Sequence, residues 1–180
     1  AVGQAAYATE ADRQTAVRLT WATLIISCKL GYIALLRNLR NILEANVSAQ
    51  VMEWVCDTLA DRFAVARSKQ LPFRFLAAYR EVKVLPTGHV AGVLAALETA
   101  IAHSAVNLRG FGSDTRVVVA CDVSGSMQKA ISPRSKVLLY DVSLVLGMLL
   151  QSRSQNVITG MFGDTWKRIS MARGPVLRNV

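Results

Sequence analysis

Apolar residues recur at helical spacing through the first part of the chain, up to about residue 108. Each predicted helix has one wide apolar face, and the segments that connect the helices are short, as in the antiparallel helix pairs of a helical stack. Ser48 stands where a helix N-cap is expected, and Pro72 suits the first turn of a helix. We therefore predict a first half built of helices alone. The stripes lie in four segments: Ile33–Leu43, Val51–Leu59, Phe73–Tyr79 and Val90–Ile101.

The pattern changes after Gly110. Arg116–Cys121 is a short apolar run rich in β-branched residues, which is typical of a strand covered on both faces. A helical stripe follows over Ser135–Leu150, and two further strands are predicted over Asn156–Phe162 and Thr165–Ser170. A strand, a helix and a strand in this order indicate that an α/β domain begins near residue 112. Because one crossover and a hairpin cannot cover both faces of a parallel sheet, we expect the chain to stop before this domain is complete.

The composition favours a folded protein, with 52% hydrophobic and 18% charged residues. The longest uncharged runs are shorter than the roughly 18 apolar residues that a membrane-spanning helix needs, so no membrane partner is expected. Cys28, Cys56 and Cys121 are far apart in apolar surroundings, which favours reduced core residues and a cytoplasmic location. The chain begins without a Met and without a signal-peptide pattern, so we expect it to be a segment of something longer.

A loop of alternating oxygen-bearing residues, Asp122, Ser124 and Ser126, follows the first predicted strand. Open α/β sheets place their ligands at the carboxyl ends of strands, and alternate residues of a tight loop are able to turn their oxygens toward one point. One carboxylate and two hydroxyls suit Mg²⁺ better than zinc. A turn in which these side chains cap backbone amides is the alternative. Asp164 is expected in a turn at the far end of the sheet, so further ligands would be waters or residues beyond Val180.

Motifs of enzymatic chemistry are not found in the sequence. It contains no phosphate-cradling glycine loop, no HExxH, no CxxC and no G-x-S-x-G elbow. Ser124 and Ser126 have no evident general base nearby, and His89 and His103 are better explained as surface or capping residues. We therefore predict a protein without catalytic activity and without a small-molecule substrate.

The formal net charge is +9, and both halves of the chain are basic. Such an excess favours an anionic partner, most often nucleic acid, although arginines that solubilise a surface give the same balance. Basic residues around Pro72, Arg67 among them, alternate with aromatic residues that are able to stack on bases. The alternative for each arginine is a structural role, pairing with a carboxylate or carbonyl of a neighbouring helix. The candidate RNA-binding residues are Arg37, Arg40, Lys69, Arg74, Arg80 and Lys83.

Three stretches of the sequence resemble known families. Cys121–Met127 resembles the metal-ion-dependent adhesion site (MIDAS) of von Willebrand factor A domains. Tyr32–Asn41 and Leu71–Tyr79 resemble the last helical repeats of the TROVE module. In this order, the combination resembles the Ro ribonucleoprotein autoantigen family and its bacterial relatives over most of residues 20–172.

The resemblance implies a fold and a function. It implies a ring of HEAT-like helical repeats closed by a Rossmann-like von Willebrand factor A domain, with residues 1–110 as the last helices and 111–180 as the first part of the A domain. It also implies binding of small non-coding, Y-like RNAs and of misfolded RNAs in RNA quality control. Asp122, Ser124 and Ser126 match the family's first metal loop, whose later Thr and Asp loops have no counterpart in this sequence. The alternative function is an A-domain adhesion or assembly module that grips a protein carboxylate through Mg²⁺ without RNA.

Overall fold

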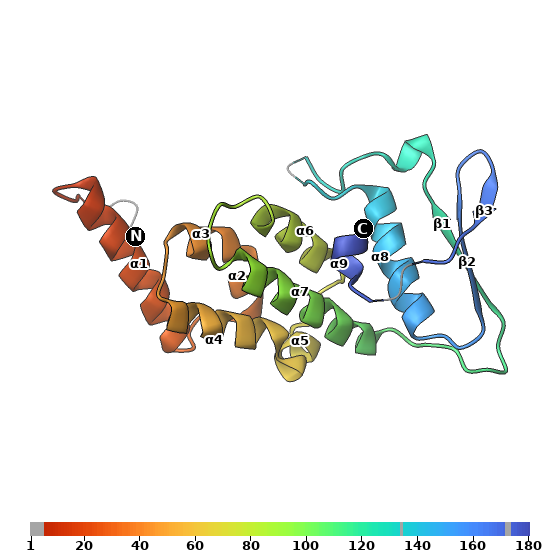
Figure 1. Ribbon diagram of the computed structural model, residues 1–180, viewed down its shortest axis with the longest axis horizontal. Coiled ribbons are helices and arrows are strands. Elements are labelled where there is room, and N and C mark those ends of the chain that lie inside the picture. The colour runs from red at the N-terminus through yellow and green to blue at the C-terminus, as the bar shows by residue number, and fades with distance from the viewer. Residues whose placement is uncertain (1–5, 134, 172–173) are drawn as a thin grey trace.

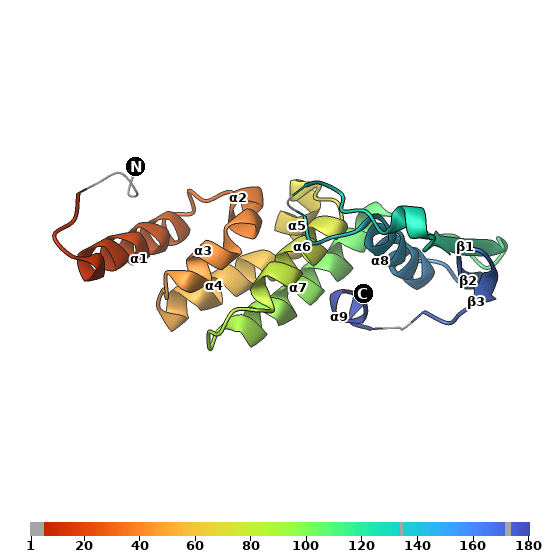
Figure 2. The same cartoon turned by 90° about the horizontal axis from the view of Figure 1, so that it is seen from above.

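The computed structural model describes residues 6–133, 135–171 and 174–180. It is elongated, with α1 at one end, a small sheet at the other, and α8 between the sheet and the remaining helices (Figures 1 and 2). The predicted change from helices to a strand–helix–strand pattern is confirmed. The helices are α1 (Glu10–Ile26), α2 (Tyr32–Arg37), α3 (Leu39–Glu44), α4 (Ala49–Ala60), α5 (Arg62–Ser68), α6 (Phe73–Val82), α7 (Val90–Ser104), α8 (Leu139–Ser152) and α9 (Val176–Asn179). The strands are β1 (Val117–Asp122), β2 (Val157–Phe162) and β3 (Trp166–Arg168).

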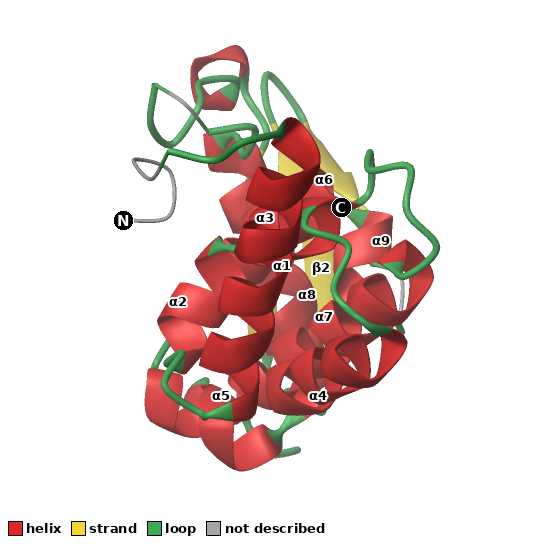
Figure 3. Cartoon of the chain, turned by 90° about the vertical axis from the view of Figure 1, so that its left-hand side faces the viewer, coloured by secondary structure: helices red, strands yellow, loops and turns green. Residues whose placement is uncertain are grey.

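The core of the helical part is built around α7. Val93, Leu97 and Ile101 are fully buried at the spacing of one helix face, and α7 packs against α4, α5 and α6. Seen from the α1 end, these helices stand in front of the sheet (Figure 3). The apolar stripe predicted over Val90–Ile101 is therefore confirmed as the centre of the helical core.

The helix predicted over Ile33–Leu43 is two short helices in the structure. Asn38, with φ −110° and ψ 10°, ends α2 and begins α3, so the chain turns there. Ser48 caps α4 as predicted, because its Oγ accepts a hydrogen bond from the backbone N–H of Val51 at 3.3 Å. The apolar pattern does not predict α5, which has only 7 residues and buries Val65 alone.

The apolar pattern does not predict α1 either, and the reason is its lack of a buried face. None of its 17 residues is buried, so no stripe marks it in the sequence. Thr9 caps its start by accepting a hydrogen bond from the backbone N–H of Asp12 at 3.1 Å. Within residues 6–133, 135–171 and 174–180, no helix combines the length and the apolar character that crossing a bilayer requires.

The sheet has three strands in the order β1–β2–β3. β1 and β2 are parallel along their whole length, and β3 runs antiparallel to β2. α8 covers the face of the sheet on which Val119 and Cys121 are buried. On the opposite face Val118 and Ile158 are exposed. The strand–helix–strand prediction is confirmed, whereas the prediction that the first strand is covered on both faces is wrong for the part of the chain that is described.

Arg80 on α6 joins the helical part to α8. Its guanidinium group donates hydrogen bonds of 2.5 and 2.9 Å to the carboxylate of Asp141 and one of 2.8 Å to the backbone carbonyl of Lys136. The Asp141 side chain is 0% exposed, and it also accepts a hydrogen bond of 2.7 Å from the backbone N–H of Leu138. Because Asp141 caps α8 in this way, the helix begins at Leu139 and not at Ser135 as predicted.

A second contact ties the C-terminal segment to the helical core. Glu98 on α7 accepts hydrogen bonds from the backbone N–H groups of Leu177 at 3.1 Å and Arg178 at 2.7 Å, at the start of α9. Leu177 is itself buried in the core. The carboxylates of Asp141 and Glu98 therefore connect α6 and α7 to α8 and α9, which come after β1 in the chain.

Candidate nucleic-acid interface and metal loop

Three of the predicted RNA-binding residues line one pocket of about 430 Å³ between α2, α3 and α6. Arg37 ends α2, Arg40 lies in the first turn of α3, and Arg74 lies in the first turn of α6. The apolar side chains of Leu36 and Leu39 also line the pocket and are buried. The structure therefore brings together arginines from three helices around one depression.

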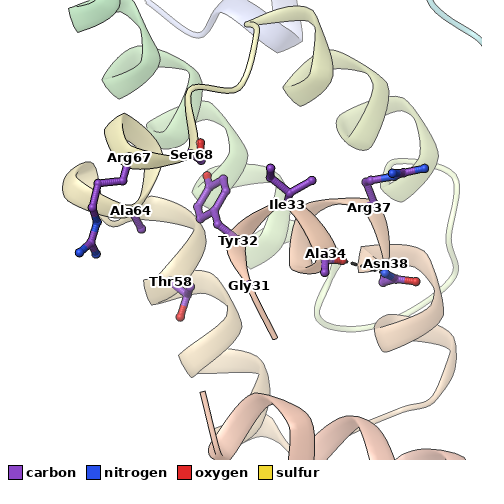
Figure 4. A pocket seen from close by; sticks show the side chains of 10 residues that line it. All are labelled: Gly31, Tyr32, Ile33, Ala34, Arg37, Asn38, Thr58, Ala64, Arg67 and Ser68. Carbon is purple, nitrogen blue, oxygen red and sulfur yellow. Dashed lines mark hydrogen bonds between the residues drawn. The ribbon is translucent and has the colours of Figure 1, made fainter. Parts of the chain in front are cut away.

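A second pocket of about 860 Å³ is formed by α2, α4 and α5, and Arg37 lines both pockets. Arg67 on α5 contributes a further guanidinium group to this second pocket. Figure 4 shows Arg37 and Arg67 on opposite sides of it, with the Tyr32 ring between them. We call Arg37, Arg40, Arg67 and Arg74 the basic surface. Arg67 lies in the basic run that the sequence shows around Pro72, but its place at a pocket depends on how α5 folds back against α2.

The positive charge of this surface is only partly neutralised. Arg40 forms ion pairs with Glu44 at 2.8 Å and Glu81 at 3.6 Å, and the hydrogen bond to Glu44 raises the pKa of Arg40. Among the residues that are described, Arg37, Arg67 and Arg74 form no ion pair. All three are exposed, so their charges are available to an anionic ligand.

The other three predicted RNA-binding residues lie elsewhere. Lys69 and Lys83 are exposed at the ends of α5 and α6, and Lys69 adopts a left-handed conformation with φ 50°. Arg80 is turned toward Asp141, and three hydrogen bonds fix its guanidinium group in the contact with α8. The structure thus gives Arg80 the structural role that was the alternative for each arginine, and we do not include it in the basic surface.

Tyr32 forms a fixed wall of the larger pocket. Its hydroxyl group donates a hydrogen bond of 2.9 Å to the backbone carbonyl of Leu59, which anchors the ring to α4. Burial raises the pKa of Tyr32 above its ordinary value, and the nearby Asp61 raises it further. The hydroxyl therefore stays neutral at physiological pH, and the ring is held in place as a part of the pocket.

The predicted metal-binding residues gather where β1 ends. The carboxylate of Asp122 accepts a hydrogen bond of 2.9 Å from the backbone N–H of Ser124, as the capped-turn alternative requires. The hydroxyl oxygens of Ser124 and Ser126 lie 3.0 Å apart, as two ligands of one ion would. Within the described residues no three His, Cys, Asp or Glu side chains come together as a metal site, so this loop offers one carboxylate and two hydroxyls. Such a hard-oxygen donor set fits Mg²⁺.

Asp164 lies at the same edge of the sheet as this loop, and the prediction that it lies at the far end is wrong. The backbone N–H of Val123 donates a hydrogen bond of 2.9 Å to the carbonyl of Phe162, next to the turn that holds Asp164. A Cβ atom placed on Gly163 would lie 3.7 Å from the Cα atom of Ser124. The signal for this placement was present in the sequence, because parallel strands end at the same edge of a sheet.

Comparison with known proteins finds a family match for the first six helices. Residues 8–89 match the family model described as the TROVE domain. Residues 8–89, which contain α1 to α6, are therefore similar to a TROVE domain. The family resemblance predicted from the sequence is thereby confirmed. The basic surface falls wholly inside the matched segment, whereas the loop at Asp122 follows it.

Individual relatives match parts of much longer proteins. Telomerase protein component 1 of Mus musculus is 42% identical over 65 residues, which are 36% of this chain and 2% of that protein. The Rattus norvegicus protein of the same name is 44% identical over 59 residues, which are 33% of this chain and 2% of that protein. The chain therefore spans a small fraction of these relatives.

A solved structure is similar in fold to nearly the whole chain. The RO (RSR) protein of Deinococcus radiodurans superposes with a TM-score of 0.58 and 20% identity over 97% of this chain and 44% of that protein's chain. At this identity the likeness concerns the fold alone. It covers both the helices and the small mixed sheet, and this helical architecture with a three-stranded sheet is the part of the predicted fold that is supported.

Proposed function

We propose that this chain is part of the RNA-binding scaffold of a Ro-type ribonucleoprotein, which holds small non-coding, Y-like and misfolded RNAs in cytoplasmic RNA quality control and has no catalytic activity. The observation that carries the proposal is the basic surface. Three guanidinium groups from α2, α5 and α6, which form no ion pair within the described residues, line two adjoining pockets in the segment that matches the TROVE domain. Guanidinium groups bind phosphates strongly, and pockets beside them give bases a place to lie.

The proposal includes an architecture for the parent protein. Residues 1–110 would be the last HEAT-like repeats of a ring, and residues 111–180 would be the first part of a von Willebrand factor A domain. The paired helices, the strand–helix–strand unit and the fold shared with the Deinococcus radiodurans RO protein support this division. The mouse and rat relatives are named as protein components of telomerase, and our proposal likewise gives this chain a role in an assembly.

Salt dependence of RNA binding tests the proposed function. Each phosphate contact gives a slope of about −0.7 to −0.9 in a plot of log affinity against log salt concentration. Contacts by Arg37, Arg67 and Arg74 would therefore give a slope of about −2.5 for the chain, so a roughly fourfold rise in salt lowers the affinity about 30-fold. Fluorescence anisotropy with a labelled RNA hairpin measures both quantities.

The outcome separates RNA binding from the adhesion alternative. A chain that binds no RNA at low salt, or binds it with a slope near zero, contradicts the proposal. Capture of a protein that depends on Mg²⁺, without any RNA binding, would support an A-domain module that grips a carboxylate. Lysozyme, a basic protein without this surface, serves as the control for binding by net charge alone.

We further propose that the loop of Asp122, Ser124 and Ser126 holds Mg²⁺ or another divalent cation. A ligand that binds only the folded state stabilises it. A Mg²⁺ concentration of ten times the Kd raises the free energy of unfolding by about 1.4 kcal/mol. The melting temperature should then rise by about 4 °C when Mg²⁺ is added, as measured by differential scanning fluorimetry. Asp122→Ala should abolish this rise because it removes the only charged ligand of the loop, and the two serine-to-alanine variants should reduce it.

Asp114→Ala is the matched control for this experiment. Asp114 is an exposed carboxylate in the segment before β1, so its loss changes the net charge equally and leaves the loop intact. The response of this variant to Mg²⁺ should equal that of the wild type. If Asp122→Ala keeps the full response to Mg²⁺, the loop is a capped turn and nothing more.

A further inference from the structure

The smaller pocket of the basic surface, about 430 Å³ in volume, contains a carboxylate as well as guanidinium groups. Glu81, in the last turn of α6, lines it together with Arg37, Arg40 and Arg74. A carboxylate among the cations of a phosphate-binding pocket opposes them in two ways, because it repels the phosphate and competes with it for the guanidinium groups. The effect of Glu81 on an anionic ligand therefore depends on which cation holds it.

Glu81 is held between two cations that come from different parts of the chain. Its Oε1 lies 3.0 Å from Nζ of Lys136, whereas its Oε2 lies 3.6 Å from Nη1 of Arg40. Arg40 is also bound by Glu44, at 2.8 Å through Nε. Lys136 forms no second ion pair within the described residues, so it is both the closer cation and the one that is not shared. Lys136 is therefore the principal partner of this carboxylate.

Lys136 reaches the pocket from outside the segment that matches the TROVE domain. It lies in the stretch that joins the loop at Asp122 to α8. Its backbone carbonyl accepts a hydrogen bond of 2.8 Å from Arg80, the residue before Glu81 on α6, and the next residue, Val137, is fully buried. Two neighbouring residues of α6 thus hold the backbone and the side chain of one lysine. The ammonium group is beside the pocket only while this stretch lies against α6.

We infer that Lys136 controls the affinity of the basic surface for RNA by neutralising Glu81, which otherwise pairs with the arginines of the pocket. The inference rests on the proposed RNA binding and names a regulation of that surface. With Lys136 in place, the guanidinium groups are open to phosphates. When the stretch before α8 moves away from α6, the carboxylate turns to the arginines and takes a phosphate contact from the RNA. The side chains of Glu81 and Lys136 are 37% and 53% exposed, so water reaches the pair and this exchange costs little free energy.

A double-mutant cycle on the whole chain tests this control, with a labelled RNA hairpin as the probe and fluorescence anisotropy as the measurement. Lys136→Met removes the ammonium group and keeps an unbranched side chain. One phosphate contact gives a slope of about −0.7 to −0.9, which at about 0.1 M salt corresponds to a roughly five- to eightfold change in affinity. Lys136→Met should lose that much affinity and that much of the slope. Together with Glu81→Gln, the same substitution should change neither quantity, because no carboxylate remains to pair with the arginines.

Lys136→Arg and Lys129→Met are the matched controls. Lys136→Arg keeps a cation for Glu81, so it should bind RNA as the wild type does. Lys129 is exposed in the same stretch and outside the pocket, so Lys129→Met changes the net charge equally and should alter the affinity by less than about twofold. Circular dichroism and thermal melting check that each variant is folded.

The proposed function and this inference fail in different ways. A wild type that binds no RNA contradicts both. If the wild type binds RNA with the expected salt slope and Lys136→Met binds it equally well, the function stands and the control by Lys136 is wrong. The control is also wrong if Lys136→Met loses as much affinity with Glu81→Gln as without it, since the lysine would then contact the RNA itself. Glu81→Gln alone should bind RNA at least as tightly as the wild type, and weaker binding by this variant overturns the inference independently.

Discussion

Replacing Arg80 with alanine is expected to lower the free energy of unfolding by about 3 kcal/mol. The variant leaves the carboxylate of Asp141 buried, at 0% exposure, without the cation that neutralises it. The Arg80 side chain is 26% exposed, so water reaches part of the pair, and we take the lower end of the range known for broken buried pairs. For a chain of this size the melting temperature should fall by about 6–12 °C in a thermal melt followed by circular dichroism.

A double-mutant cycle isolates the ion pair from other effects of the substitution. Asp141→Ala should be as harmful as Arg80→Ala, because it also removes the acceptor for the Leu138 backbone N–H at the start of α8. The double variant should be much less destabilised than the sum of the two single variants, since it leaves no buried charge without a partner. Lys83→Ala, on the neighbouring exposed position, should change stability by less than about 0.5 kcal/mol. Equal melting temperatures for Arg80→Ala and Lys83→Ala would show that the pair does not join the two parts.

Local features of this fold were predictable because they depend on residues close together in the sequence. The stripe of α7, the Ser48 cap and the change to β-branched residues before β1 each follow from a pattern within a few turns or one strand. The loop of Asp122, Ser124 and Ser126 was likewise found from its alternation. The hydroxyl oxygens of Ser124 and Ser126 lie 3.0 Å apart, while the carboxylate of Asp122 accepts a hydrogen bond from the backbone N–H of Ser124. In each case the physical cause of the structure lies within the segment itself.

Features that depend on the packing of distant segments were not predictable. Arg80 and Asp141 are 61 residues apart, and nothing near either residue indicates its partner. Without that contact, nothing in the sequence distinguishes Arg80 from Arg74, which is exposed and lines a pocket. The pocket at Arg67 has the same origin, because it exists only where α5 lies against α2 and α4. Charge pattern therefore predicted a nucleic-acid surface, and only the fold separates its members from structural arginines.

Reversing the charges of Arg37, Arg67 and Arg74 on the basic surface should have the largest effect on RNA binding. Changing Arg37, Arg67 and Arg74 together to glutamate removes three expected phosphate contacts and places three carboxylates beside the RNA. We expect the affinity for a labelled RNA hairpin to fall at least about 100-fold, which corresponds to roughly 3 kcal/mol, because contacts between charged groups are among the stronger polar interactions. The salt slope should fall from about −2.5 to near zero, since the counterions released by those contacts are no longer displaced.

A matched triple variant separates the surface from the net charge of the chain. Lys29, Lys129 and Lys167 are exposed, lie outside both pockets, and change the net charge by the same amount when they are replaced with glutamate. If RNA is held at the basic surface, this control should lose only the weak, long-range part of its affinity and should keep most of its salt slope. If the two triple variants lose affinity equally, RNA responds to total charge, and the basic surface is not its site. Both triple variants should fold, because all six substituted side chains are exposed and none makes an ion pair within the described residues. Circular dichroism on the same samples checks this expectation.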